Sequence, residues 1–420
     1  MEQLHKKFTD EQVKDLMKRH LNKELKSEHI QQMLKIKRRQ FFKLLKVYRQ
    51  NPQTFSIRYT RIAKTRTLDP KIEKNILKEL KSTKSFIDDK DIPIRFYNYT
   101  FIQKDLEQRL NQKVSLPTII DRAKKNGFYI NRTKAHKTHD REVITNHVGE
   151  LTQHDSSFHR WSPYVDEKWY LITSLDDYSR FIFYAMLVPH ESAWAHIMAL
   201  QTVFLKFGLP LKFYVDSHSI FRFVRGRDEL HYQHHKLTDE VNPQWKQVLN
   251  DCQVEVIYAL SPQAKGKIER PYQWLQDHIV RICARDNIKT IAPANQVLFR
   301  EVHQYNYKWV HSTTKEIPYF RFQRALQEKK SLLRQFIIPP PYQSIKDIFC
   351  LRMDRVVDNY RTVSVNNLQL KFNNAPIRET VNLRIYQHNK SDLSEVRFWY
   401  KDNLLDTQQV KTDLLLPVHF

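Results

Sequence analysis

Glycine, cysteine and long apolar runs are scarce in this sequence of 420 residues, and each shortage excludes a class of protein. Only five glycines occur, and none stands in a GxGxxG or GxxxxGK[ST] pattern, which excludes the common glycine-rich nucleotide-binding loops. The cysteines Cys252, Cys283 and Cys350 lie far apart without CxxC spacing, so a disulfide framework and a zinc ribbon are excluded and a reducing cytosol is favoured. No apolar run approaches membrane-spanning length and Met1–Lys7 is polar, so we expect no membrane partner, anchor or signal peptide.

Positive charge, in contrast, is abundant and unevenly distributed. Lysine and arginine number 70 against 46 acidic residues, which gives a net charge of +24. Residues 1–150 carry +17 of this excess, residues 151–300 carry +1 and residues 301–420 carry +6. A basic front half is typical of proteins that bind nucleic acid, and a merely soluble basic surface is the alternative. The length allows roughly two to four domains.

Residues 1–60 are predicted to form three short helices. Thr9 is a suitable cap for the first helix, and the second follows Ser27. The third runs from Arg38 to Arg49 with Phe42 and Leu45 buried and Phe41 as a further candidate for burial. The opposite face of the third helix is basic, with Arg38, Arg39, Lys43 and Lys46. This pattern predicts a helix-turn-helix domain that binds DNA, and a small bundle with a solvated charged face is the alternative.

Residues 61–135 are predicted to form a second helix-turn-helix-like DNA-binding unit. Its helices begin after Asp69-Pro70, at Thr100 and at Ser115, and Lys84–Ile94 is predicted to be a loop. The last helix presents Arg122, Lys124 and Lys125 and is the candidate for DNA contact. Two such units would let one protein read a bipartite DNA sequence.

From Leu151 onward the pattern changes to short apolar runs that are typical of strands. Three strands are followed by a helix, a strand, a helix, a strand and a final helix. The segments after the first strand are 169–175, 181–188, 191–207, a run ending at Asp216, 244–251 and 254–259. This order predicts an α/β domain over residues 145–328.

Three carboxylates stand at the ends of these elements: Asp155, Asp216 and Glu269. Asp216 follows Asp155 by 61 positions and precedes Glu269 by 53. Carboxylates on two strands and a helix can converge on two divalent cations roughly 3.5–4 Å apart, and Mg²⁺ prefers such hard oxygen ligands. Glu269 lies in Ser261–Arg270, whose cations Lys265, Lys267 and Arg270 form a plausible phosphate-facing surface at a helix start. Pro271 requires this helix to begin near Ile268.

These residues resemble the DDE triad of bacterial insertion-sequence transposases, which have a retroviral-integrase-like catalytic core. Ser261–Arg270 resembles the family's motif around the glutamate, Ile172–Arg180 its second strand, and Tyr305-Asn306 with His311 and Pro318 its closing segment. The resemblance covers roughly residues 145–325. Two departures are the long spacing before Glu269, which indicates an insertion near Phe221–Val241, and the proline at position 271.

The resemblance implies a ribonuclease-H-like core and a small β-barrel at residues 345–420, after the linker Pro339–Pro341. It also implies metal-dependent cleavage of element ends and strand transfer during DNA integration, with Mg²⁺ or Mn²⁺, two ions, held by Asp155, Asp216 and Glu269. Double-stranded DNA, a homo-oligomer assembled on it and the bacterial cytosol or nucleoid are further expectations. A structure-selective metal-dependent nuclease and a DNA-binding regulator derived from a transposase are the alternatives.

The sequence contains two other groups of possible metal ligands. Asp176 and Asp177 are interpreted as a structural turn. His231, His234 and His235 lack a cysteine or acidic partner at ligand spacing, and a metal role for them is disfavoured.

Overall fold

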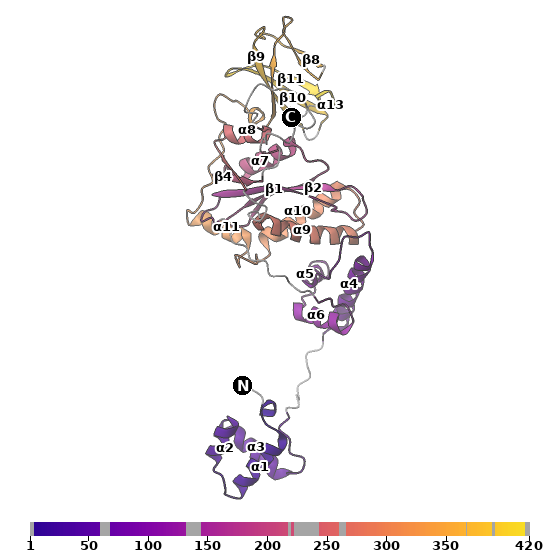
Figure 1. The fold of residues 1–420 in the computed structure, drawn as a ribbon, viewed down its shortest axis with the longest axis vertical. Helices are drawn as coiled ribbons and strands as arrows, with labels where there is room; N and C mark the ends of the chain where they lie inside the picture. The colour runs from indigo at the N-terminus through magenta and orange to yellow at the C-terminus, as the bar shows by residue number, and fades with distance from the viewer. Residues whose placement is uncertain are drawn as a thin grey trace. The chain divides into compact units, whose positions relative to one another are not determined.

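The computed structural model describes residues 4–58, 68–131, 144–216, 220–221, 243–259, 266–366, 368–388 and 391–415, and side chains within 266–270 are not described. The chain divides into two compact units, Met1–Lys74 and Asn75–Phe420, and each is treated by itself below (Figure 1). Apart from Phe221, the predicted insertion with His231, His234 and His235 lies outside the described residues, as do residues 132–143. None of the described helices is long and apolar enough to cross a membrane.

The first unit is a three-helix cluster, as predicted. A short 3₁₀ turn at Leu4–Lys6 precedes α1 (Asp10–Leu21), α2 (Ser27–Leu34) and α3 (Arg38–Gln50). Thr9 caps α1 in a capping box with Gln12. Phe41 and Leu45 of α3 are buried four residues apart, whereas Phe42 is 46% exposed. The prediction that Phe42 is buried was therefore wrong, because the α3 stripe passes through Phe41 instead.

A second group of helices opens the larger unit. It consists of α4 (Pro70–Asp88), whose first residues lie before the division, α5 (Tyr99–Leu110) and α6 (Leu116–Lys125). Asn98 caps α5 and Ser115 caps α6 through their side chains. Helix α4 continues to Asp88, so the loop predicted from Lys84 begins later than expected.

A five-stranded sheet forms the centre of the larger unit, with the order β3-β2-β1-β4-β5. Strands β1, β2 and β3 are antiparallel, and β4 and β5 continue the sheet in parallel to β1. The strands are β1 (Leu151–His159), β2 (Trp169–Asp176), β3 (Ile182–Val188), β4 (Lys212–Val215) and β5 (Glu255–Tyr258). The predicted sequence of strands and helices is confirmed.

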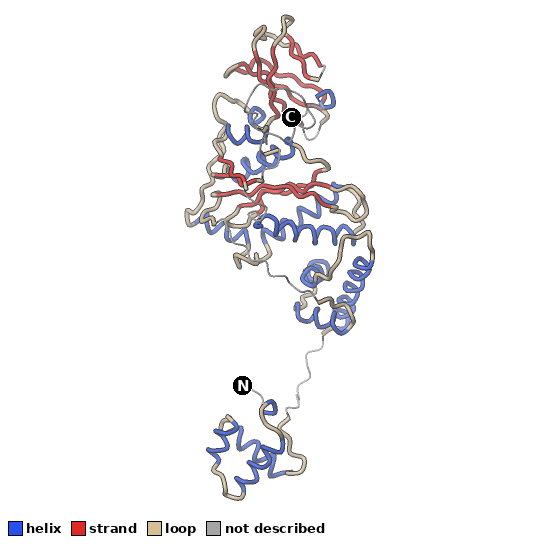
Figure 2. Tube along the Cα trace, in the orientation of Figure 1, coloured by secondary structure: helices blue, strands red, loops and turns tan. Residues whose placement is uncertain are grey.

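Helices cover both faces of this sheet (Figures 1 and 2). One face carries α7 (Ala193–Phe207) and α8 (Gln244–Asp251), and the other carries α9 (Gly266–Arg285) and α10 (Ile291–Tyr307). Helix α11 (Pro318–Gln327) follows, with its proline in the first turn. Pro271 lies inside α9, because α9 begins at Gly266 rather than near Ile268, and the expected first-turn position was wrong. A proline at this depth removes one backbone hydrogen bond.

The C-terminal region is built from strands, but the predicted small β-barrel is not what the described residues form. Four strands make one sheet in the order β11-β10-β9-β6, and β7 and β8 make a separate hairpin. The elements are α12 (Ile345–Ile348), β6 (Leu351–Val356), β7 (Thr362–Val365), β8 (Leu368–Lys371), β9 (Thr380–Gln387), β10 (Leu393–Tyr400), β11 (Asn403–Lys411) and α13 (Thr412–Leu415). A barrel needs its edge strands to pair, and β6 and β11 do not pair with each other.

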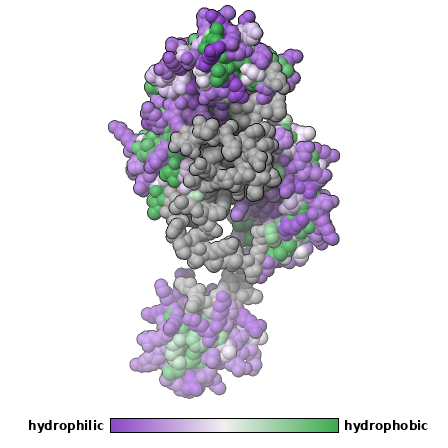
Figure 3. Space-filling model, turned by 45° about the horizontal axis from the view of Figure 1, so that its top comes forward, coloured by the Kyte–Doolittle hydropathy of each residue, from purple (hydrophilic) through white to green (hydrophobic). Residues whose placement is uncertain are grey.

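Buried apolar side chains gather in separate clusters on the two faces of the central sheet. On the α7 and α8 side the cluster continues into the C-terminal region, where Phe349 and Phe398 are buried. On the α9 and α10 side a second cluster includes Leu275, Ile279 and Leu298. On the face drawn in Figure 3 the described surface is mainly hydrophilic, with small scattered hydrophobic patches.

Candidate active site

Asp155 lies on β1, and Asp216 directly follows the neighbouring strand β4. Strands β1 and β4 pair in parallel with Leu151 opposite Lys212 and Gln153 opposite Tyr214. Continuing this register by two residues places Asp155 beside Asp216, since both pairs differ by the same 61 positions. Neighbouring strands are roughly 4.8 Å apart and residues in register share one face of the sheet. The two carboxylates predicted from the sequence are therefore brought together.

The backbone around both residues is held on two sides. Asp155 is an interior residue of β1 and is paired with Thr173 of β2. Asp216 directly follows β4, and the amide of Ala259 donates a 2.8 Å hydrogen bond to the carbonyl of Val215. Both aspartates are half-buried. A central position in a sheet thus fixes the two carboxylates more firmly than a loop would.

Tyr272 connects α9 to this pair of carboxylates. The hydroxyl of Thr173, opposite Asp155, donates a 2.7 Å hydrogen bond to the hydroxyl oxygen of Tyr272. Burial raises the pKa of Tyr272 well above its usual range. The negative charge of Asp155 raises that pKa further, as do those of Glu191 and Asp216. Helix α9 therefore packs against the site at Tyr272.

Glu269, the third predicted carboxylate, lies on α9 three residues before Tyr272. Its side chain is outside the described residues, as are those of Lys267 and Arg270, and Lys265 is wholly outside them. Among the side chains that the structure describes, no group of three or more histidine, cysteine, aspartate or glutamate residues could hold a metal ion. The metal-binding role of the three carboxylates remains a prediction.

A buried polar chain supports β1 on the face opposite Asp155. His154 contacts Ser174 through Nδ1 and His196 through Nε2, both at 2.8 Å. His196 Nε2 lies 3.0 Å from a carboxylate oxygen of Glu191, which also accepts a hydrogen bond from Ser156. Neutral histidines satisfy the chain if Ser174 donates to His154, His154 to His196 and His196 to Glu191.

This chain fixes the residues immediately before and after Asp155. His154 is adjacent to Asp155 in the sequence, whereas Glu191 and His196 were not expected to belong to the site. The sequence carried one signal for His154: side chains alternate along a strand, so His154 lies on the face of the sheet opposite Asp155. No pattern in the sequence indicated which residues of the following helix would meet it.

The acidic pair after β2 is structural, as predicted. Asp176 is fully buried and accepts hydrogen bonds from the amides of Gly149 and Ser179 and from the hydroxyl of Ser179. Burial raises its pKa to about 6 despite these bonds. Asp177, also buried, forms a 3.1 Å ion pair with Arg180. Both carboxylates are thus engaged in holding the turn.

The predicted closing segment packs against the edge of the sheet. The side chain of Asn306 accepts a hydrogen bond from the amide of Ile182 and donates one to its carbonyl, both at 2.9 Å. Tyr305 beside it is buried, and Pro318 begins α11. Asn306 thereby ties α10 to β3.

The predicted DNA-binding cations that the structure describes are mostly exposed. Four of them lie on α3 of the first unit: Arg38, Arg39, Lys43 and Lys46. On α6, Lys124 and Lys125 are exposed and Arg122 is half-buried. Arg122 and Lys125 both form ion pairs with Asp121, at 2.6 and 2.8 Å, which partly neutralise that surface. DNA contact by these residues remains a prediction.

No family model matches the chain, whereas curated relatives do. It is 25% identical over 238 residues to a putative transposase, y4bF, of Sinorhizobium fredii, covering 57% of this chain and 47% of the relative. It is 26% identical over 212 residues to the transposase for insertion sequence IS1202 of Streptococcus pneumoniae, covering 50% and 43%. The chain is related to bacterial transposases. It spans just under half the length of these relatives.

Among solved structures, the chain is similar to the catalytic core domain of BIV integrase. It is 15% identical and covers 43% of this chain and 98% of its own, with a TM-score of 0.31. The strand order β3-β2-β1-β4-β5, with helices on both faces, describes the fold of this chain directly.

Proposed function

We propose that this chain is a transposase that cleaves DNA at the ends of a mobile element and joins those ends to target DNA. The observation that carries the proposal is the shared level of Asp155 and Asp216 on adjacent parallel strands, with Tyr272 of α9 within their electrostatic reach. The strand order and the flanking helices support a ribonuclease-H-like core of the integrase type. Similarity to two transposases supports the same reaction class.

Asp155, Asp216 and Glu269 are the residues that would hold the metal. Paired carboxylates at one level fit Mg²⁺ or Mn²⁺, which prefer hard oxygen ligands, and we propose two ions. A related integrase core, that of HTLV-2, has been solved with magnesium. When bound, such ions stabilise the charge on attacking and leaving oxygens in phosphoryl transfer.

The chain's own residues set the geometry of this site. The β1–β4 register fixes the two aspartates relative to each other, and the Thr173–Tyr272 hydrogen bond fixes α9, which carries Glu269, relative to β1 and β2. Tyrosine is protonated at neutral pH, and burial raises the pKa of Tyr272 further. We therefore assign Tyr272 the role of a spacer between α9 and β2, rather than of a base or a nucleophile.

DNA recognition is assigned to the helical regions. We propose that α3 and α6 contact double-stranded DNA through their basic residues and that Lys265, Lys267 and Arg270 follow phosphates near the site. Binding through phosphates weakens as salt rises. Bringing two element ends together requires at least a dimer on DNA, and the bacterial cytosol is where such DNA is present.

A strand-transfer assay tests the proposal. Purified protein is incubated with labelled DNA from the flanks of its gene, supercoiled target and Mg²⁺. Asp155→Asn and Asp216→Asn are each expected to reduce joined product roughly a thousandfold or more, because each removes a metal-binding charge while leaving DNA affinity intact. Asp166→Asn is the matched control, since Asp166 is exposed in the same domain.

The outcomes separate the alternatives. If Asp216→Asn joined DNA as well as the native protein, the site assignment would be wrong. Cutting without joining by the native protein would indicate the structure-selective nuclease. Specific DNA binding with neither reaction would indicate the regulator.

A further inference from the structure

One oxygen atom, Oε1 of Glu191, ends the buried polar chain behind Asp155. It accepts a hydrogen bond from the hydroxyl of Ser156, and Nε2 of His196 lies 3.0 Å from it. Glu191 stands three residues after β3 and directly before Ser192, which caps α7. The Glu191 side chain is only 11% exposed. A single carboxylate oxygen therefore ties the connection between β3 and α7 to the residue that follows Asp155.

Aromatic rings enclose the two histidines of this chain. The ring of His154 stacks on Trp245, with ring centroids 5.7 Å apart. The ring of Phe221 lies 5.6 Å from His154 and 5.0 Å from His196, and all four of these side chains are buried. A buried donor that loses its acceptor is costly because water cannot replace the hydrogen bond. Since each histidine passes one hydrogen bond to the next group, the chain needs an acceptor at its end, and Glu191 supplies it.

The two neighbouring strands do not pair with β1 over the same length. In the described residues β1 pairs with β4 from Leu151 to Gln153, which is two residues before Asp155, whereas its pairing with β2 continues past Asp155. The hydrogen bond from Ser156 to Glu191 holds β1 directly after Asp155, beyond the end of the β4 ladder. Groups that orient metal ligands matter for metal binding, and loss of one typically costs roughly 10- to 100-fold in affinity or activity.

We propose that Glu191 is a positioning residue of the candidate active site, which holds β1 so that the Asp155 carboxylate is oriented toward a divalent metal ion. The inference rests on the proposed function, because it assumes that Asp155 binds the metal. Glu191 acts through its hydrogen bonds and not through its charge. Both of these bonds end on the same oxygen atom, so the carbonyl oxygen of an amide can replace it.

Two substitutions of Glu191 in the full chain separate the acceptor from the charge. Glu191→Ala removes the acceptor. We expect the dissociation constant for Mn²⁺, measured without DNA by electron paramagnetic resonance of the free ion, to rise roughly tenfold, and joined product to fall by a similar factor. Glu191→Gln keeps a carbonyl oxygen, so both values should stay within about twofold of those of the native protein. The affinity for element-end DNA should not change in either variant, because the defect lies in the metal site.

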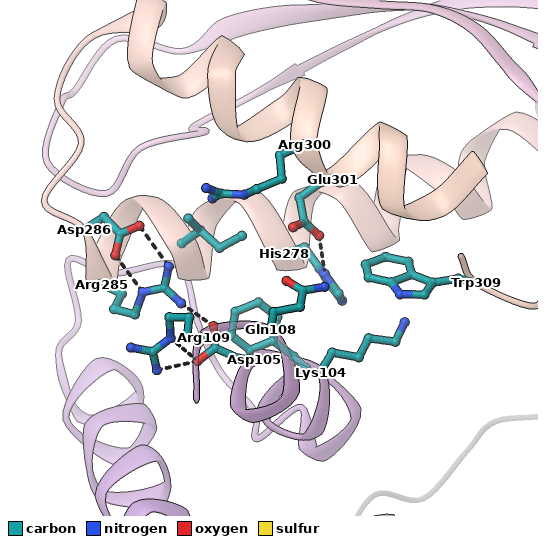
Figure 4. A pocket seen from close by; sticks show the side chains of 12 residues that line it. Lys104, Asp105, Gln108, Arg109, His278, Arg285, Asp286, Arg300, Glu301 and Trp309 are labelled. Carbon is teal, nitrogen blue, oxygen red and sulfur yellow. Dashed lines mark hydrogen bonds and ion pairs between the residues drawn. The ribbon is translucent and has the colours of Figure 1, made fainter. Parts of the chain in front are cut away.

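A second buried pair of histidine and glutamate provides the matched control. Oε2 of Glu301 lies 2.9 Å from Nδ1 of His278, and both side chains are buried on the α9 and α10 side of the sheet (Figure 4). Glu301→Ala deletes the carboxylate of this pair. It should lower the melting temperature as Glu191→Ala does, but leave the Mn²⁺ dissociation constant unchanged. If Glu191→Ala does not fold, Ser156→Ala tests the same hydrogen bond, and we expect it to raise that constant about threefold.

The three variants together decide the role of Glu191. Weaker Mn²⁺ binding in Glu191→Ala that is restored in Glu191→Gln and absent in Glu301→Ala supports the proposal. Equal losses in Glu191→Ala and Glu191→Gln would show that the charge matters instead of the hydrogen bonds, and would overturn it. Native Mn²⁺ binding in Glu191→Ala would also overturn it, and the proposed function survives that failure if the native protein joins DNA. A native protein that neither binds Mn²⁺ nor joins DNA would count against the proposed function itself.

Discussion

The two faces of the central sheet are joined to the rest of the larger unit by different kinds of contact. On the α7 and α8 face the apolar core continues without interruption into the C-terminal region, where the ring of Phe349 lies 5.9 Å from Phe204 and 5.6 Å from Phe336. On the other face, α9 meets the α4–α6 region largely through polar groups. Asp105 pairs with Arg285, and the amide of Asn98 donates a 2.5 Å hydrogen bond to Asp277.

This contact region between α9 and α4–α6, the polar seam, also has an apolar component, in which Phe101 of α5 packs against the α9 and α10 cluster. Ile92 and Ile94 pack against Val280 and Ala284 of α9, and Arg281 donates a 2.6 Å hydrogen bond to the carbonyl of Phe96. Apolar burial is insensitive to salt and non-directional, whereas ion pairs are screened and depend on geometry. We therefore expect the C-terminal strands to unfold together with the catalytic core, and the α4–α6 region to separate from it more easily.

The largest effect is expected from opening the apolar face. Phe349→Ala should lower the free energy of unfolding by about 3–5 kcal/mol, because it leaves a cavity in a fully buried cluster. Chemical denaturation should show the core and the C-terminal strands unfolding in one transition. Ile337→Ala is the control, since Ile337 is 72% exposed. Loss of the C-terminal strands alone, with the core intact, would contradict the shared-core description.

A smaller effect is expected from breaking the polar seam. Asp105→Asn should cost about 1–3 kcal/mol, because Arg109 and the largely buried Arg285 lose the carboxylate between them. Hydrogen exchange should rise in α5 and in the C-terminal half of α9, while β9 and β10 stay protected. Asp121→Asn removes a more exposed ion-pair partner and should have little effect. Equal deprotection of β9 would show that the two faces are not independent.

The same substitution can be made at two tyrosines whose hydroxyls form hydrogen bonds near the two ends of α9. Tyr272→Phe deletes the hydroxyl that forms a 2.7 Å hydrogen bond with Thr173. Tyr164→Phe deletes the hydroxyl that donates a 2.7 Å hydrogen bond to the carbonyl of Ala284 in α9. Each should cost about 1 kcal/mol of stability. Only Tyr272→Phe should also slow strand transfer, roughly tenfold, because it loosens α9 beside Asp155 and Asp216. Equal strand-transfer rates in the two variants would show that Tyr272 does not position the site.

The smallest effect is expected from salt alone. Raising the salt concentration from 0.1 to 1 M should speed hydrogen exchange in α5 by a few-fold at most, because screening weakens the partly exposed ion pairs of the seam. Exchange in β9 should not speed up. A faster rate in β9 than in α5 would reverse the comparison between the two faces.

Much of the core was predictable because its signals are local. Apolar runs and caps located the helices and strands, and the separation of 61 positions between Asp155 and Asp216 proved to equal the offset of the β1–β4 register. The separation in sequence alone does not show that the two aspartates lie at the same level. That conclusion also requires the pairing of β1 with β4.

The features that were missed depend on contacts between distant segments. Local pattern did not reveal that His154 would meet His196 and Glu191 across the sheet, nor that β6 and β11 would remain edges instead of closing a barrel. Burial of Phe41 rather than Phe42 was decided by packing against the other helices of the first unit, since both rings fit a helical stripe. Strand pairing and core packing are non-local, which is why these predictions failed.

The most direct test of the central claim is to locate bound metal. Crystals of the full chain with element-end DNA and Mn²⁺ would show the ions by anomalous scattering, and strand transfer in the same buffer would establish that the complex is active. We expect Mn²⁺ in contact with Asp155 and Asp216, and loss of that signal in Asp216→Asn. Mn²⁺ bound elsewhere in an active complex, with both aspartates empty, would contradict this expectation.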